Sequence, residues 1–211
     1  MTDVAGMPRA AAQTGLSPAL PQRAAALLDF WFGPPDAPGP EQRRQIWFRS
    51  TPEFDETVRR HFERDHEQAS AGALDPWEAT AAGALALLLL LDQVPRNIFR
   101  GTPRAYATDP AARIVADRAL AGGHDRLVPP VWRIFFYLPF EHSEAIADQR
   151  RGLALFAGLP VDPAHPDMMR KVRRHLEIIE RFGRFPHRNL ILGRASTPAE
   201  TAFLGEPESS F

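Results

Sequence analysis

The 211-residue chain contains no cysteine, which excludes disulfide bonds, thiolate metal sites and a cysteine nucleophile. Lysine is almost absent as well: Lys171 is the only one among 25 Lys and Arg residues, which leaves 24 arginines. Arginine is always charged and presents a planar fork of donors that fits carboxylate and phosphate groups. A GC-rich genome produces the same excess of arginine without a functional reason, so the excess alone does not identify a ligand.

An excess of charge of one sign and a long hydrophobic run are also lacking. The 25 basic residues face 26 acidic ones, and a net charge of −1 provides no field that would recruit nucleic acid or an anionic membrane. The most apolar run, residues 81–91, is far shorter than the roughly 20 residues that span a bilayer. No apolar segment near the N-terminus resembles a signal peptide. We therefore expect a cytoplasmic protein without a membrane partner, in which residues 81–91 form a core helix.

The motifs of common cofactor and metal enzymes are missing. The sequence has no Walker loop, no GxGxxG, no HExxH and no GxSxG. Glu63 and His66 have the spacing of half a di-iron site, but no second copy exists. We expect no cofactor and no metal. Seven basic residues against two acidic ones between Arg170 and Arg188 raise RNA binding as an alternative, but the balanced net charge favours a solvated helix face.

Proline marks the starts of helices. Thr51, Asp75, Asp109 and Thr197 each precede a proline, as an N-cap residue precedes proline in the first helical position. Two of these sites add a glutamate that completes a capping box. No segment alternates as a strand does, although the aromatic run over residues 131–137 cannot be assigned from periodicity. We predict an all-α chain with helices over residues 21–32, 41–48, 52–70, 76–93, 110–121, 142–157, 166–183 and 198–204.

No change in composition marks a domain boundary, and no internal repeat is evident. We therefore predict one helical domain over residues 21–205, with a flexible N-terminal extension over residues 1–20 and a C-terminal tail over residues 206–211.

Two of the predicted helices carry a histidine on an apolar face. His175 lies inside the apolar arc of the helix over residues 166–183. In the helix over 142–157, His142 and Gln149 are one heptad apart on the apolar side, while Glu141 and Glu144 are one turn apart beside them. Each histidine is either a core residue bonded to a carbonyl or an imidazole placed for proton transfer.

Two further polar clusters adjoin apolar segments. Asp92 follows the leucine run and is expected to end its helix, where an acid is disfavoured unless a cation pairs with it. Three arginines that follow, Arg96, Arg100 and Arg104, could supply that cation, either in a structural network or in an anion-binding pocket. The second cluster is a loop that follows Gly183. Its residues are suited to recognise an anion, and they are Arg181, Arg184, His187, Arg188 and Asn189.

Five strings of the sequence resemble one known family. They are DFWFG (29–33), WF (47–48), LLLLLDQVPRNIFRGTPRAYATD (87–109), FYLPFEHSE (136–144) and RFGRFPHRNLILGRASTPAE (181–200). These strings resemble the bacterial family called domain of unknown function 924, from about Leu27 to Leu204, with minor departures such as Val94. The resemblance implies a single-domain helical array of the tetratricopeptide-like kind, a right-handed superhelix. The family name itself records that no activity is established.

Two functions fit these observations. The first is a pocket that binds a small anionic molecule, a carboxylate or a phosphate, with possible acid–base chemistry. Its candidate catalytic residues are His142, His187, Glu141 and Glu144. Its candidate ligand-binding residues are Asp92, Arg96, Arg100, Tyr137, His175, Arg181, Arg184 and Asn189. The second is a non-catalytic helical scaffold that binds a protein or peptide, in which the same residues form interior salt bridges.

Overall fold

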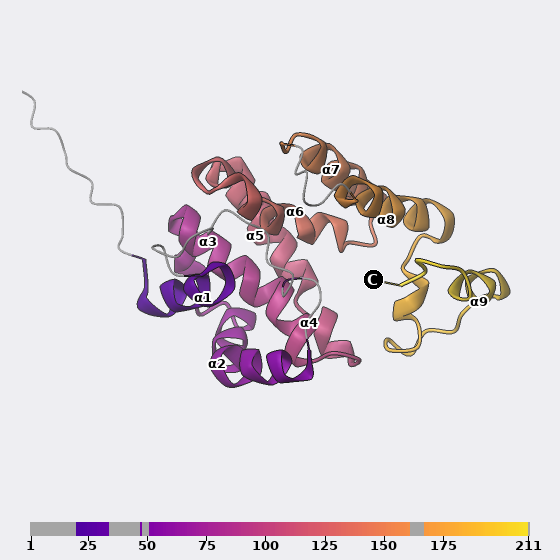
Figure 1. Ribbon diagram of the computed structural model, residues 1–211, viewed down its shortest axis with the longest axis horizontal. Coiled ribbons are helices and arrows are strands. Elements are labelled where there is room, and N and C mark those ends of the chain that lie inside the picture. The colour runs from indigo at the N-terminus through magenta and orange to yellow at the C-terminus, as the bar shows by residue number, and fades with distance from the viewer. Residues whose placement is uncertain (1–19, 34–46, 48–50, 161–166, 211) are drawn as a thin grey trace, which may run out of the picture.

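The computed structural model describes residues 20–33, 47, 51–160 and 167–210. Within these ranges the chain is helical and no strand occurs, which confirms the predicted all-α class. The helix predicted over 41–48 and the extension over 1–20 lie outside the described residues, apart from Trp47 and Leu20. The helices of Figure 1 are α1 (Gln22–Phe32), α2 (Pro52–Ser70), α3 (Ala81–Leu88), α4 (Val94–Ile98), α5 (Asp109–Ala121), α6 (Ile134–Glu141), α7 (Ile146–Ala157), α8 (Met168–Phe182) and α9 (Pro198–Leu204).

The two threonine caps are present as predicted. Thr51 accepts a hydrogen bond from the Phe54 backbone N–H at 3.3 Å and starts α2. Thr197 and Glu200 form a complete capping box at the start of α9. These helix starts depend on residues close in sequence, which is why the sequence alone predicts them.

The other two proline sites differ from the prediction. Asp75–Ala79 forms only a short 3₁₀ turn, and Thr80 caps α3 by accepting the Gly83 N–H at 3.0 Å. The predicted continuous helix from residue 76 is therefore wrong. A side chain at Gly83 would place its Cβ 2.1 Å from the carbonyl oxygen of Trp77, so the turn and α3 approach each other as closely as they do because position 83 is glycine. Asp109 begins α5 without capping it, and its carboxylate instead binds Arg96.

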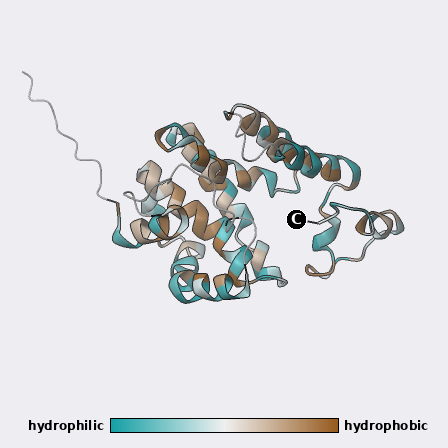
Figure 2. Ribbon diagram, in the orientation of Figure 1, coloured by the Kyte–Doolittle hydropathy of each residue, from teal (hydrophilic) through white to brown (hydrophobic). Residues whose placement is uncertain are grey.

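The centre of the protein is a continuous helical stretch from Ala81 to Ile98, built of α3, a π-helical turn (Leu89–Gln93) and α4. It is apolar and long enough to cross a membrane, yet 83% of it is buried inside the protein. Helices α1, α2 and α5 pack against it, and Figure 2 shows the hydrophobic residues concentrated along it. It is thus the predicted core helix.

The π-helical turn corrects the prediction that Asp92 ends its helix. Val94 N–H bonds the carbonyl of Leu89, one residue further back than in an α-helix, which leaves the Leu90 carbonyl free. His66 Nδ1 bonds that carbonyl at 2.8 Å. Pro95 has no N–H for the Leu91 carbonyl, and the Thr108 hydroxyl donates to it at 2.6 Å instead. Asp92 therefore lies inside a helix that continues past it.

The aromatic run over residues 131–137 enters a helix, α6, which is buried along its whole length. A helix that is apolar on all sides has no periodic pattern, so the sequence could not assign it.

The helix predicted over 142–157 begins later, at Ile146. Glu141 is the last residue of α6, His142 follows as its C-cap, and Glu144 lies in the turn between α6 and α7. His142 and Gln149 therefore do not share a helix face, which corrects that prediction. Gln149 is buried, and its amide donates to the Glu141 and Ser143 carbonyls at 2.5 and 2.7 Å. These bonds fix the turn that carries His142.

The C-terminal part adds a second, smaller apolar cluster of Ile178, Ile179, Phe185 and Phe203. After α9 the chain returns alongside α8 toward the middle of the protein (Figure 1). In this returning segment the Glu208 carboxylate pairs with Arg170 of α8, and the Ser209 hydroxyl donates to the Leu204 carbonyl at 3.1 Å. The single domain, and the tetratricopeptide-like superhelix that the resemblance implies, stay predictions.

Candidate functional site

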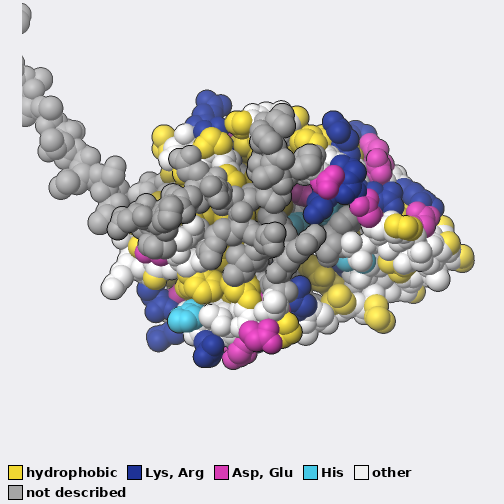
Figure 3. All heavy atoms as spheres, in the orientation of Figure 1, with side chains coloured by type: hydrophobic (Ala, Val, Ile, Leu, Met, Phe, Trp, Pro, Cys, Tyr) yellow, Lys and Arg dark blue, Asp and Glu magenta, His cyan; other side chains and the backbone are white. Residues whose placement is uncertain are grey.

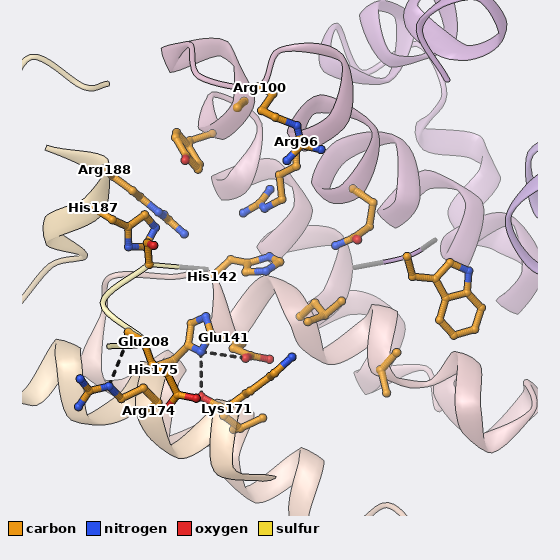
Figure 4. A pocket seen from close by; sticks show the side chains of 18 of the residues that line it. Arg96, Arg100, Glu141, His142, Lys171, Arg174, His175, His187, Arg188 and Glu208 are labelled. Atoms are coloured by element: carbon orange, nitrogen blue, oxygen red, sulfur yellow. Dashed lines mark hydrogen bonds and ion pairs between the residues drawn. The ribbon is translucent and has the colours of Figure 1, made fainter. Parts of the chain in front are cut away.

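A cavity of about 770 Å³ lies where α4, the end of α6, α8 and the loop after α8 meet. Figure 4 shows side chains that enter it from these elements, with His142 between Arg96 on one side and His175 on the other. The basic side chains that line it are Arg96, Arg100, Arg170, Lys171, Arg174 and Arg188, with three histidines, His142, His175 and His187. The acidic side chains among the described lining residues are Glu141 and Glu208.

A chain of charged groups forms one wall of the cavity. Arg96 Nη1 lies 3.3 Å from Asp92 Oδ1, and its guanidinium binds both carboxylate oxygens of Asp109, at 2.9 and 3.1 Å. The same Asp109 carboxylate lies 3.5 Å from Arg188 Nη1. Although burial opposes it, Asp92 and Asp109 hold the pKa of Arg96 above its ordinary value. Two carboxylates and two guanidinium groups thus balance one another within this wall.

His142 is held by Asp92. Its Nδ1 lies 2.7 Å from Asp92 Oδ1, and 15% of the side chain is exposed. Burial, and then Arg96, lower the pKa of His142, so the imidazole is neutral at pH 7. Burial raises the pKa of Asp92, but Arg96 and His142 outweigh it and keep the carboxyl ionised. The neutral imidazole therefore donates from Nδ1 to Asp92, and Nε2 carries the lone pair.

His175 and Glu141 meet on the opposite side. His175 Nδ1 lies 2.9 Å from the Lys171 carbonyl oxygen and 3.1 Å from Glu141 Oε1. Burial lowers the pKa of His175 to about 3, and burial followed by the charge of Arg188 lowers that of His187 to about 4. Both imidazoles are therefore neutral at pH 7 and can donate or accept hydrogen bonds without adding charge.

Arg188 is the most enclosed of the cationic side chains, with 8% of its side chain exposed. Its guanidinium lies over the Tyr106 ring at 4.6 Å and over the Phe185 ring at 4.5 Å. Its Nε has no hydrogen-bond partner among the described residues. Burial and the nearby Arg96 lower the pKa of Arg188, so a bound anion would relieve an unfavourable environment.

The mouth of the cavity is formed by α8 and the returning C-terminal segment. Arg170, Lys171 and Arg174 lie on α8, and Glu208 faces them. The Glu208 carboxylate binds Arg170, and its carbonyl accepts from Arg174 Nε at 3.3 Å (Figure 4). Glu208 has φ 55°, and it is the one residue other than glycine with positive φ in the described chain. Such a conformation is uncommon for a residue with a Cβ.

Comparison with known proteins shows the family of the chain. Residues 27–208 match the family described as "Bacterial protein of unknown function (DUF924)". The chain belongs to this family. The chain is also similar to a solved structure, that of the protein of unknown function ATU0120 from Agrobacterium tumefaciens. The two chains are 44% identical, with a TM-score of 0.75, and the match covers 86% of this chain and 96% of that one. No curated protein matches the chain.

Six of the predicted site residues line the cavity of this DUF924 chain, and they are Arg96, Arg100, Glu141, His142, His175 and His187. Of these, Arg100 is committed elsewhere, because it binds both oxygens of Asp55 at 2.8 and 3.2 Å. Asp92 lies behind His142 and does not line the cavity. The structure thus brings together residues from three of the strings that carry the resemblance.

The other predicted residues lie outside the cavity. Glu144 accepts the Phe185 N–H at 2.8 Å and binds Arg194 through both oxygens. Arg184 binds both oxygens of Glu200, at 2.6 and 2.8 Å. These pairs hold the loop over residues 185–194 to the rest of the protein, and so support His187 and Arg188 indirectly.

Three more predicted residues have contacts away from the cavity. Arg181 is half exposed and lies 3.6 Å from Glu206. Tyr137 donates to Asp125 at 2.8 Å, and burial followed by that carboxylate raises the pKa of the phenol. Asn189 is buried between Ser196 and Arg194.

The α8 residues at the mouth are not among the site residues predicted from the sequence, and Arg188 is predicted only as one of the loop residues suited to recognise an anion. The amphipathic pattern places Arg170 and Arg174 on the polar side of α8, and that side borders the cavity as well as solvent. Nothing in the sequence near Arg188 indicates that its guanidinium packs between two aromatic rings. His66, the residue with metal-ligand spacing, binds the Leu90 carbonyl, and no group of three His, Asp or Glu among the described residues could hold a metal ion.

Proposed function

We propose that the cavity binds a small molecule carrying a carboxylate or a phosphate. The observation that supports this most directly is the composition of the lining: six Arg and Lys residues against two Glu among the described residues. Guanidinium and ammonium groups in a partly enclosed site favour an anionic ligand, because a low local dielectric strengthens the attraction.

Carboxylates of the protein itself pair with some of the cationic side chains in the cavity, and the remaining cations are available to a ligand. Arg96 and Arg100 are paired with Asp109 and Asp55 through two oxygens each. Within the described part of the chain, Arg188 forms one ion pair, a single contact of 3.5 Å with the same Asp109, and Glu144 adds a weaker attraction. Arg188 and Lys171, which project into the cavity from opposite sides, are therefore the primary ligand-binding residues in this proposal (Figure 4).

A long polyanion fits the protein less well than a small ligand does. On the face shown in Figure 3, Lys and Arg alternate with Asp and Glu around α7 and α8 instead of forming a stripe of one sign. Tracking a nucleic-acid backbone requires such a stripe. The cationic excess is local to the cavity, as the net charge of −1 requires.

Replacement of Lys171 by glutamine is expected to weaken binding of inorganic phosphate and of citrate by roughly three- to tenfold, the worth of one charge-assisted hydrogen bond. Isothermal titration calorimetry at low salt measures the change. Arg173→Gln is the matched control, because Arg173 is exposed on the same helix and does not line the cavity. Equal affinities for the two variants, or binding of peptides alone, would reject a small-anion site.

Glu208→Gln is expected to tighten phosphate binding by roughly three- to tenfold, because a carboxylate at the mouth competes with the ligand for Arg170. Glu208 also has a positive φ, a backbone conformation that costs free energy for a residue with a Cβ. Glu180→Gln is the control, since Glu180 also lies on α8 and pairs with an arginine, Arg150, but neither of these two residues lines the cavity. Weaker binding after Glu208→Gln would mean that Glu208 helps to hold the ligand instead of competing with it.

A further inference from the structure

We propose that Asp92 and His142 form a catalytic dyad, in which His142 Nε2 removes a proton from a substrate or a water molecule inside the cavity. This inference rests on the proposed anion site, which would hold the substrate by its carboxylate or phosphate. It goes further by assigning a reaction type, general-base catalysis, and a reacting atom.

The geometry of the dyad carries the inference. Asp92 accepts from His142 Nδ1 at 2.7 Å, so the opposite ring nitrogen, Nε2, points away from the carboxylate. Nε2 has no hydrogen-bond partner among the described residues, and His142 lines the cavity. In Figure 4 the ring of His142 lies in the space between Arg96, Arg188 and His175. The lone pair of Nε2 is therefore available to a molecule in the cavity.

Asp92 is itself fixed on every side, which a positioning residue requires. The Gln93 amide donates to its Oδ2 at 2.6 Å, and Arg96 lies 3.3 Å from its Oδ1. The carboxylate is 2% exposed. Asp92 and Gln93 both lie in the π-helical turn, and such turns are frequent at functional sites.

His142 has the electrostatic surroundings of a general base. Burial and Arg96 keep its pKa below the ordinary value, while Asp92 and Asp109 oppose that shift. His175 and His187 are neutral neighbours at pH 7, and Arg188 is a cationic one. At pH 7 the imidazole is thus ready to accept a proton, and the Asp92 carboxylate stabilises the imidazolium that forms.

The proton transfer can be tested with a simple ester, 4-nitrophenyl acetate. His142 Nε2 takes a proton from a water molecule as the water oxygen bonds to the acetyl carbon. The bond from that carbon to the phenol oxygen then breaks, and 4-nitrophenolate leaves with the electron pair. The products are acetate and 4-nitrophenolate, and the proton on His142 passes to solvent. The nearby arginines would stabilise the oxyanion formed on the acetyl oxygen.

We expect the intact protein to release 4-nitrophenolate at least tenfold faster than His142→Gln at pH 7, a modest part of the 10²- to 10⁴-fold that a positioned base supplies. Asp92→Asn should lose most of the same factor, because an asparagine amide favours the wrong tautomer of His142. His61→Gln is the control, since His61 is an exposed histidine on α2 and its removal should leave the rate unchanged. Equal rates for the intact protein and His142→Gln would overturn the dyad.

A second measurement needs no variant and so does not depend on how a variant folds. Long-range ¹H–¹⁵N spectra of the intact protein report the tautomer of each histidine. We expect His142 to be neutral and protonated on Nδ1 at pH 7. A proton on Nε2, or a charged ring, would refute the inference.

Inorganic phosphate separates this inference from the proposed function. If phosphate binds and slows the ester reaction, both are supported. If phosphate binds but His142→Gln reacts like the intact protein, the anion site stands and the dyad fails. If the reaction depends on His142 but phosphate neither binds nor inhibits, the anion site fails.

Discussion

Replacement of Asp109 by alanine is expected to lower the free energy of unfolding by about 3–5 kcal/mol, the usual result of removing one partner from a buried charge network. Asp109 holds Arg96 through two hydrogen bonds and lies 3.5 Å from Arg188. Without it, two guanidinium groups that are 20% and 8% exposed keep only Asp92, beside Arg96, and the more weakly interacting Glu144, near Arg188, as counter-charges among the described residues. The repulsion between Arg96 and Arg188, which Asp109 now offsets, would add to the loss.

Asp117→Ala is the matched control for this experiment. Asp117 lies on the same helix, α5, and also pairs with two arginines, Arg113 and Arg151, but all three side chains are about a third or more exposed. Exposed pairs contribute about 0–1 kcal/mol. Urea denaturation of both variants gives the comparison. A loss of less than about 1 kcal/mol for Asp109→Ala would show that the wall of the cavity does not depend on charge balance.

The parts of the fold that the sequence predicts are those that depend on neighbouring residues. The starts of α2 and α9 follow from a threonine and a proline, and the capping box of α9 is complete in the structure. Helix α8 follows from its strong amphipathic pattern, and it ends at Gly183, which has φ 69° as expected of a left-handed C-cap. In each case the physical cause lies within a few residues of the feature.

The parts that the sequence does not predict depend on residues far apart. Helix α6 is buried on all sides, so its pattern cannot distinguish helix from strand. The π-helical turn at Asp92 is stable because His66 and Thr108 satisfy the carbonyls that it and Pro95 leave free. These partners are 24 and 17 residues away from the carbonyls they bind.

In the candidate site, too, contacts between residues close in sequence can be predicted, and contacts between residues far apart in sequence cannot. Arg96 is one helical turn from Asp92, and the sequence identified it as a possible partner. The pairing of Asp92 with His142 joins residues 50 positions apart, and that of Glu144 with Arg194 joins residues equally distant. An ion pair forms between groups that the fold brings close together, and the 24 arginines of this chain offer many alternative partners for each carboxylate. Which arginine meets which carboxylate is therefore decided by the fold and cannot be read from composition.

The stability of the protein is expected to fall steeply as pH decreases from about 6.5 toward 4. Burial lowers the pKa of His175 to about 3 and of His187 to about 4, whereas an unfolded chain has histidine pKa values of about 6.5. Between these values the unfolded chain binds more protons than the folded protein. The stability that these neutral histidines contribute is therefore complete above about pH 6.5 and is lost as pH falls.

Each such histidine contributes a slope of at most about 1.4 kcal/mol per pH unit, so these two together approach about 2.7 kcal/mol per unit near pH 5 and less toward pH 6 and pH 4. The pKa values of His66 and His142 are also lowered, chiefly by burial, and steepen the dependence. Glu144 and Glu200, whose pKa values are held down by Arg194 and Arg184 in spite of burial, act in the same direction at lower pH. Their contribution is present above about pH 4.3 and is lost below it.

Urea midpoints measured from pH 8 to pH 4 test this expectation, and His175→Gln isolates one of its sources. The variant should lose about 1.4 kcal/mol per pH unit from the slope, since one titrating group is removed from the folded core. Added salt should change the slope little, because burial and not a long-range field lowers these pKa values. A flat pH profile in the intact protein would mean that the histidines are charged and solvated in the folded state. It would then also deprive His142 of the neutral form on which proton transfer in the cavity depends.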